Sequence, residues 1–137
     1  MNITIYTDGG SLNNPGQAAI AYLIYQNKKL VFSHGERIGV ASNNVAEYTA
    51  LISAFKKARD QIKNKSVTSI SVFADSQLMI RQLQGLYKVK HVDIKPLFHQ
   101  VKELETNLPV IPIYTHVMRD KNTDADLLVK KALGVER

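Results

Sequence analysis

Four acidic side chains at separate places in the chain are the first candidates for chemistry: Asp8, Glu47, Asp75 and Asp126. Carboxylates that gather at one place repel one another, so such a cluster favours bound cations. Two Mg²⁺ ions about 3.5–4 Å apart would activate a water molecule and stabilise both the attacking and the leaving oxygen of a phosphodiester. If the fold brings the four together, these residue types predict metal-dependent phosphodiester hydrolysis.

Each carboxylate also has a purely structural explanation when it is taken alone. Asp8 precedes a Gly-Gly pair, and Asp and Gly favour tight turns for backbone reasons. Glu47 follows Asn44 by three residues, which is the spacing of a capping box at a helix start. Asp75 fits the N-cap of a helix that begins directly after it. The catalytic interpretation therefore depends on the joint arrangement.

The last acidic position leaves a choice between two residues. Asp124 and Asp126 both fall in the first turn of the last expected helix, where the helix dipole favours a carboxylate. Thr123 could be the cap of that helix. Taken alone, neither residue demands a function.

The charge balance makes nucleic acid a plausible partner. Eighteen Lys and Arg residues against twelve Asp and Glu residues give a formal net charge of +6 and a sequence pI near 9.6. This surplus would steer the protein toward phosphate backbones, although ordinary basic proteins use it for solubility. Because cysteine is absent, a disulfide-linked partner is excluded and any metal must take oxygen or imidazole ligands.

Length and hydropathy set the expected organisation. The 137 residues, 45% of them hydrophobic, predict one compact domain over residues 1–137. The N-terminus has no basic stretch followed by a long apolar run, and eighteen apolar residues never occur in succession. We therefore expect a soluble cytoplasmic protein with no membrane partner, acting as a monomer.

The elements that must position the carboxylates follow from hydrophobic periodicity. Residues 2–8 alternate between two faces and end at the Gly-Gly turn, which is typical of a half-buried strand. Two more β-rich runs, residues 17–25 and 29–38, are separated by a short polar connection suited to a hairpin. The first three strands are therefore expected to be antiparallel.

The rest of the chain alternates helices with strands. Apolar side chains at three- and four-residue steps over residues 45–62 predict the clearest helix. The later segments are a strand at 68–75, helices near 76–84 and 93–106, a strand at 110–116 and a helix at 122–133. This order predicts an α/β fold with one mixed sheet covered by helices. Asp8 and Asp75 each close a strand, where ligands of such sheets tend to bind.

Four motifs follow one another along nearly the whole chain. They are Thr7-Asp8-Gly9-Gly10-Ser11 with Asn14-Pro15-Gly16, then Ser42-Asn43-Asn44-Val45-Ala46-Glu47, then Asp75-Ser76-Gln77, and finally Asn122-Thr123-Asp124-Ala125-Asp126-x-Leu128. In type and order they resemble the motifs of the type 1 ribonucleases H. The resemblance implies the ribonuclease H fold, with a five-stranded mixed sheet in the order 3-2-1-4-5.

The resemblance also implies which residues carry the chemistry. It gives catalytic and metal-binding roles to Asp8, Glu47, Asp75 and Asp126. Asp126 is preferred because it lies four residues after Asn122, and Asp124 is held in reserve. The implied cofactors are two Mg²⁺ ions, or Mn²⁺, which Asp8 and Asp75 would bind most directly.

The activity implied by the resemblance is endonucleolytic hydrolysis of the RNA strand of RNA–DNA hybrids. One ion would activate the attacking water and the other would stabilise the departing 3′ oxygen, leaving 5′-phosphate and 3′-hydroxyl ends. Glu47 could also meet a 2′-hydroxyl beside the scissile bond, a group that DNA lacks.

Substrate contacts are implied for a further set of residues: Gly9, Gly10, Ser11, Asn14, Asn43, Asn44 and Gln77. Lys88 and Lys90, together with Lys95, could touch phosphates, although a solvated basic loop explains these lysines equally well. The interval 86–91 stands where many members have a long basic protrusion. We therefore expect modest affinity for the hybrid, with no separate hybrid-binding domain to add to it.

Better-known members carry a catalytic histidine in a loop before the last acidic residue. The corresponding stretch here, residues 116–122, is shorter. Val117-Met118-Arg119 fits a version with an arginine, which would let Arg119 assist release of product or metal. His116 is expected to end the fifth strand structurally.

Two other functions fit the same chain. One is a non-catalytic nucleic-acid-binding module that has kept the fold and the basic surface, and the complete acidic set argues against it. The other is an exonuclease or strand-transfer domain on the same fold. The Asn43-Asn44 pair and Asp75-Ser76-Gln77 favour hybrid cleavage over this second alternative.

Overall fold

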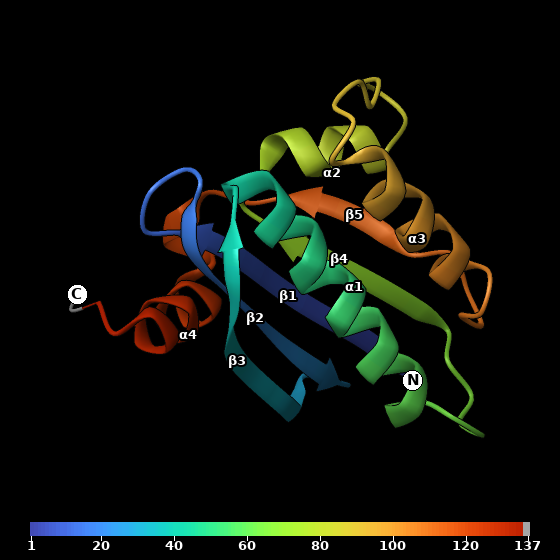
Figure 1. The fold of residues 1–137 in the computed structure, drawn as a ribbon. Coiled ribbons are helices and arrows are strands. Elements are labelled where there is room, and N and C mark those ends of the chain that lie inside the picture. Colours follow the sequence, from blue (N-terminus) through green and yellow to red (C-terminus); the bar gives the residue numbers. More distant parts are fainter. Residues whose placement is uncertain (136–137) are drawn as a thin grey trace.

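The computed structural model describes residues 1–135, and its centre is a five-stranded sheet (Figure 1). The strands are β1 (Asn2–Ser11), β2 (Gly16–Gln26), β3 (Lys29–Ala41), β4 (Ser69–Ala74) and β5 (Ile113–His116). Their order across the sheet is β3-β2-β1-β4-β5. β2 is antiparallel to β1 and β3, whereas β4 is parallel to both β1 and β5. The predicted mixed sheet and its strand order are confirmed.

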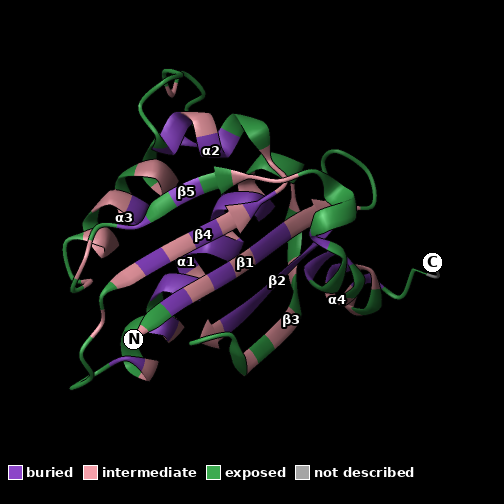
Figure 2. Ribbon diagram, turned by 180° about the vertical axis from the view of Figure 1, so that it is seen from behind, coloured by how far each residue is buried: buried purple, intermediate pink, exposed green. Residues whose placement is uncertain are grey.

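Helices pack on both faces of the sheet. α1 (Asn43–Gln61) lies on β1 and β2 with α3 (Lys95–Glu105) beside it, and α2 (Gln77–Leu83) follows β4. The short helix η1 (Arg119–Lys121) leads into α4 (Thr123–Leu133), which packs on the opposite face. Figure 2 shows that α4 lies at one side of that face, so much of β4 and β1 has no described helix over it. None of the described helices is long and apolar enough to cross a membrane.

The main core lies between β1 and α1. Ile3 and Ile5 alternate along β1 toward α1, where they meet Leu51 and Phe55, and all four side chains are fully buried. Burial of each such side chain contributes about 1.5–3 kcal/mol. This packing fixes α1 along β1 and thereby fixes the position of Glu47 in the first turns of the helix.

The end predicted for the first strand is wrong. Gly9 and Gly10 do not form a turn after Asp8; they pair with Ile20 and Ala19 of β2, and β1 continues to Ser11. The pairing with a long neighbouring strand outweighs the local turn preference of an Asp-Gly-Gly run.

Two later boundaries also differ from expectation. β5 begins at Ile113 rather than at residue 110, because the prolines on either side of that segment cannot donate to the sheet. α3 begins at Lys95 rather than at residue 93 and carries Pro96 in its first turn, as expected. α2 is followed by Gly85 with a positive φ of 82°, which confirms the expected helix stop.

Candidate active site

The register of the two central parallel strands places Asp8 beside Asp75. The pairing of β1 with β4 ends at Thr7 and Ala74. Asp8 and Asp75 are therefore the first residues beyond the last pair, on adjacent strands that run in the same direction. Two acids from segments far apart in the sequence meet at this edge of the β1–β4 ladder.

Glu47 reaches this place because α1 touches β1 at a glycine. A Cβ added at Gly9 would lie 2.4 Å from the carbonyl carbon of Ala46 and 2.7 Å from the backbone nitrogen of Glu47. Real Cβ atoms do not approach backbone atoms so closely, so only glycine permits this contact. The close approach brings the start of α1 against the end of β1, and Glu47 is 7% exposed there.

Three of the predicted carboxylates form a cluster. One oxygen from each of Asp8, Glu47 and Asp75 lies within 4.8 Å of the other two. Within residues 1–135, Glu47 Oε1 and Asp75 Oδ2 are buried without any hydrogen-bond partner. A buried acceptor that lacks a partner costs free energy, so this cluster is suited to a ligand that supplies positive charge.

The electrostatics of the cluster point the same way. Burial, with the charges of Asp75 and Asp126, raises the pKa of Asp8 from 3.8 to about 8, against the opposing Gly9 amide. Burial, with the charges of Asp8 and Asp75, also raises the pKa of Glu47 well above its ordinary value. A hard divalent cation can replace the protons that these groups hold, and oxygen ligands are what Mg²⁺ and Mn²⁺ prefer. The residues present therefore fit such ions.

Asp126 lies near the cluster without belonging to its closest three. It is 8% exposed on the first turn of α4, and its Oδ2 atom is 3.1 Å from Lys130 Nζ. Its negative charge is among the causes of the raised pKa of Asp8, which places it within electrostatic reach. The positive charge of Arg119 opposes the rise in the pKa of Asp8, so the predicted arginine also lies on this side of the molecule. Asp124 is exposed and belongs to a different surface.

The capping explanations for Glu47 and Asp75 are wrong. Ser42, not Asn44, caps α1, and its side chain accepts a hydrogen bond from the Val45 amide at 3.2 Å. Ser76, not Asp75, caps α2 in the same way. With serines at both caps, the nearby carboxylates are free for another role.

Thr123 does not cap α4 either, because the N-cap position belongs to Asn122. The buried Asn122 side chain instead donates from Nδ2 to the carbonyl oxygen of Thr7 at 2.9 Å. One end of this bond lies next to Asp8 and the other lies one helical turn before Asp126. Asn122 thus joins β1, which carries Asp8, to α4, which carries Asp126. Its position in the sequence motif had suggested only the start of a helix.

The other end of α4 is also fixed by a residue that sequence reasoning missed. Arg37 of β3 donates from Nε to the Ala132 carbonyl oxygen at 2.8 Å and from a terminal nitrogen to the Leu133 carbonyl oxygen at 3.3 Å. An exposed arginine in a strand gives no local signal of such a contact, since its acceptors lie 95 and 96 residues away.

The polar residues with predicted substrate contacts lie around the same end of the sheet. Asn43 Oδ1 accepts hydrogen bonds from the Ser11 backbone amide at 2.9 Å and from the Ser11 hydroxyl at 3.0 Å. The backbone amide of Asn43 donates to Asn14 Oδ1 at 2.9 Å. These bonds join the β1–β2 turn to the start of α1. Asn44 and Gln77 are exposed at the starts of α1 and α2.

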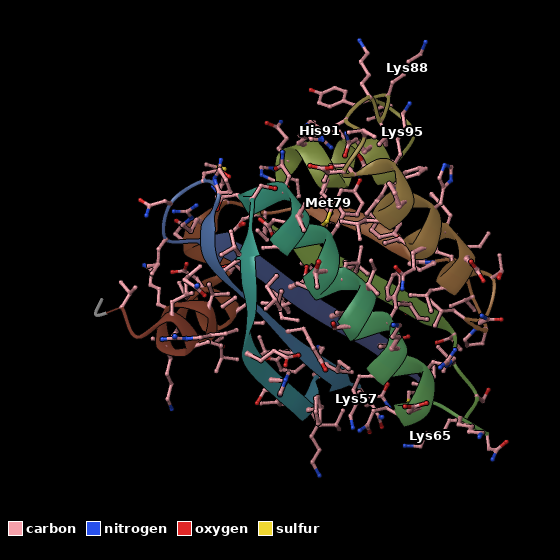
Figure 3. All side chains as sticks on the ribbon, viewed as in Figure 1. Lys57, Lys65, Met79, Lys88, His91 and Lys95 are labelled. Carbon is pink, nitrogen blue, oxygen red and sulfur yellow. The ribbon has the colours of Figure 1, made fainter. Side chains whose placement is uncertain are left out.

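The predicted phosphate contacts lie apart from that group. Lys88 and Lys90 are exposed in the loop between α2 and α3. Figure 3 labels Lys88 on this loop and Lys95 where α3 begins. His116 is the last residue of β5, as expected, and pairs with Ala74.

Comparison with known proteins gives a consistent result. A family model described as RNase H matches residues 1–134. Ribonuclease HI of Halobacterium salinarum is 38% identical over 129 residues, which cover 93% of this chain and 62% of that protein. A bifunctional protein of Mycobacterium tuberculosis is 35% identical over 135 residues, which cover 97% of this chain. The chain spans only 36% of the length of that mycobacterial relative.

A solved structure is similar over almost the full length. The crystal structure of LC11-RNase H1 in complex with an RNA/DNA hybrid has a TM-score of 0.91 and 36% sequence identity, and the match covers 96% of each chain. Similar sequence and similar geometry therefore agree over the whole of the fold described above.

Proposed function

This chain belongs to the ribonuclease H family, and from that membership we propose that it hydrolyses the RNA strand of RNA–DNA hybrids. The observation that carries the proposal is the cluster of Asp8, Glu47 and Asp75, which come from three separate elements and include two buried oxygens without partners. The whole protein's activity and partners are part of this proposal, since the similar region makes up only part of several relatives.

We propose that the cluster, with Asp126 beside it, binds divalent cations. Asp8 and Asp75 would hold them most directly, because these residues lie at the ends of adjacent parallel strands. Two bound Mg²⁺ or Mn²⁺ ions would supply an activated water and charge stabilisation of the reacting phosphate. The raised pKa values of Asp8 and Glu47 support this assignment, because such protonated acids bind cations by releasing protons.

The chain's own residues would select and hold the hybrid. Glu47 would accept a hydrogen bond from a 2′-hydroxyl beside the scissile bond, which would distinguish the RNA strand from DNA. Asn43, Asn44 and Gln77 would make contacts in the minor groove. Arg119, whose charge partly opposes the rise in the pKa of Asp8, would assist release of product or metal at the end of the reaction. The expected products are endonucleolytic fragments with 5′-phosphate and 3′-hydroxyl ends.

An end-labelled RNA–DNA hybrid tests this proposal. Purified protein is incubated with the hybrid, with single-stranded RNA and with duplex DNA, in the presence and absence of Mg²⁺ or Mn²⁺. We expect cleavage only of hybridised RNA and only with metal. Asp75→Asn should reduce the rate by a hundredfold or more, on the order of losing one group that stabilises a transition state. Asp60→Asn, at an exposed position in the second half of α1, is the matched control and should keep the activity.

The rival function predicts a different result. If the protein retards the hybrid on a gel while neither metal supports cleavage, the chain is a binding module and the proposed hydrolysis is wrong. If single-stranded RNA or duplex DNA is cut equally well, the proposed substrate selection is wrong.

A further inference from the structure

A pocket of about 510 Å³ opens on the face of the sheet opposite α1, apart from the carboxylate cluster. Its floor is formed by β1, β2 and β4, and its rim by the β2–β3 turn, η1 and the first turn of α4. Figure 2 looks onto this face and shows β4 and β1 uncovered beside α4. None of Asp8, Glu47 and Asp75 lines it.

The floor of the pocket is aromatic. Tyr6 and Phe73 are neighbours in the β1–β4 register, and their rings are stacked with centroids 5.1 Å apart. Tyr25 meets Tyr6 edge to face, with centroids 6.0 Å apart. The rings pack against one another, but all three residues are only half-buried, so part of this aromatic surface is open to a ligand. A base can stack on such a surface whatever its identity, because every base has a π-face.

The rim carries charges of both signs. Lys28 and Lys121 contribute two exposed ammonium groups from the β2–β3 turn and from η1. Asp124, on the first turn of α4, lines the same pocket with an exposed carboxylate. In the part of the chain that the structure describes, none of these three rim residues forms an ion pair. Their charges are therefore available to a ligand.

We propose that this pocket binds one ribonucleotide. The base would pack on the open part of the aromatic floor formed by Tyr6, Tyr25 and Phe73. Asp124 would accept hydrogen bonds from the ribose hydroxyls, and Lys28 and Lys121 would pair with the phosphate. This gives Asp124 a binding role outside the catalytic cluster. The ligand chemistry is that of a ribonucleoside phosphate, either free or as one nucleotide of single-stranded RNA.

Nuclear magnetic resonance on the metal-free protein tests this inference independently of hydrolysis. The protein in EDTA is titrated with 5′-AMP and, separately, with a short oligoadenylate RNA. We expect saturable shifts in the rings of Tyr6, Tyr25 and Phe73 and in the amides of residues 123–125, with little change at the Asn44 amide. Shifts with AMP alone identify a free nucleotide as the ligand, and shifts with the oligonucleotide alone identify single-stranded RNA.

Two results would overturn the inference. One is the absence of shifts at these residues with millimolar AMP and with the oligonucleotide. The other is an equal response to inorganic phosphate alone, which would mean that the lysines bind an anion without any role for the aromatic floor. Because no metal is present, neither result bears on the proposed cleavage activity.

Variants separate the parts of the pocket. Tyr6→Leu should weaken AMP binding about tenfold, the usual effect of losing one stacking partner, whereas Tyr87→Leu on the exposed α2–α3 loop should not change it. The wild type should bind AMP about tenfold more tightly than 5′-dAMP, and Asp124→Ala should abolish that preference. Retention of the preference in Asp124→Ala would contradict the assigned ribose contact. The amide spectrum of each variant serves as the check that it is folded.

Discussion

The half-buried Glu105 and the carboxylate cluster of Asp8, Glu47 and Asp75 differ in whether their polar atoms have partners. At the far side of the sheet, Glu105 of α3 accepts a hydrogen bond from the Tyr114 hydroxyl and lies 3.4 Å from Lys102 Nζ. Lys102 also donates to the Leu83 carbonyl oxygen at 3.1 Å. In the carboxylate cluster, by contrast, Glu47 Oε1 and Asp75 Oδ2 have no hydrogen-bond partner within the described residues.

The difference separates an acid that stabilises the fold from the acids that we propose take part in chemistry. A buried polar group with all its partners rigidifies the fold, and a buried group without them costs free energy. Glu105 therefore joins α3 to β5, whereas a bound cation would stabilise the cluster of Asp8, Glu47 and Asp75. Mutations should accordingly have opposite effects in the two groups.

The largest expected effect is on hybrid cleavage, when the carboxylate cluster is changed. Glu47→Gln removes the cost of keeping this buried carboxyl group protonated at neutral pH, so we expect the metal-free protein to become more stable while hybrid cleavage falls a hundredfold or more. Thermal unfolding and the cleavage assay measure the two quantities on the same preparation. A variant that lost both stability and activity would mean that Glu47 is a structural acid like Glu105.

The next effect is the pH dependence of stability without metal. Because the folded protein holds protons on Asp8 and Glu47 at pH values where the unfolded chain has released them, the free energy of unfolding should fall as pH rises from about 4 to about 8. The fall should be a few kcal/mol, since each pKa unit corresponds to about 1.4 kcal/mol.

Urea unfolding in EDTA at several pH values measures this dependence, and Mg²⁺ should restore stability most strongly near pH 8. The same series on Glu47→Gln should have a smaller slope. A flat profile in the wild type would show that the cluster is not protonated, and the contrast with Glu105 would disappear.

A smaller effect is expected where β1 touches α1. Gly9→Ala places a methyl group against the backbone of Ala46, which should cost about 2 kcal/mol and shift Glu47 away from its neighbours. Gly10→Ala is the matched control, because its Cβ would meet nothing closer than 3.9 Å. Equal stability of the two variants in urea unfolding would rule out the close contact.

The smallest effect is expected around Glu105, whose carboxylate has partners. Tyr114→Phe deletes the hydroxyl that donates to Glu105 and should cost about 1 kcal/mol of stability without changing hybrid cleavage. Tyr87→Phe, in the exposed loop, should cost nothing measurable. Loss of cleavage in Tyr114→Phe at a temperature where it is folded would mean that the two clusters are coupled.

Local patterns of the sequence predict much of this fold. The apolar steps over residues 45–62 predicted α1 to within two residues at its start, and the polar connection after residue 25 predicted the β2–β3 hairpin. The motif spacing, through the resemblance that it carried, also gave the strand order. The end of β1 could not be predicted in this way, because pairing of Gly9 and Gly10 with β2 depends on a strand further along the chain.

The sequence by itself determined the acidic residue types, the helices and strands that carry them and the family to which they belong, because periodicity and motifs are local properties. Only the tertiary structure decided that serines cap α1 and α2, that Gly9 lets Glu47 approach Asp8, and that Asp124 lies on another surface from Asp126. Those outcomes depend on strand register and on how α1 and α4 dock on the sheet, and both are set by contacts between residues far apart in the chain.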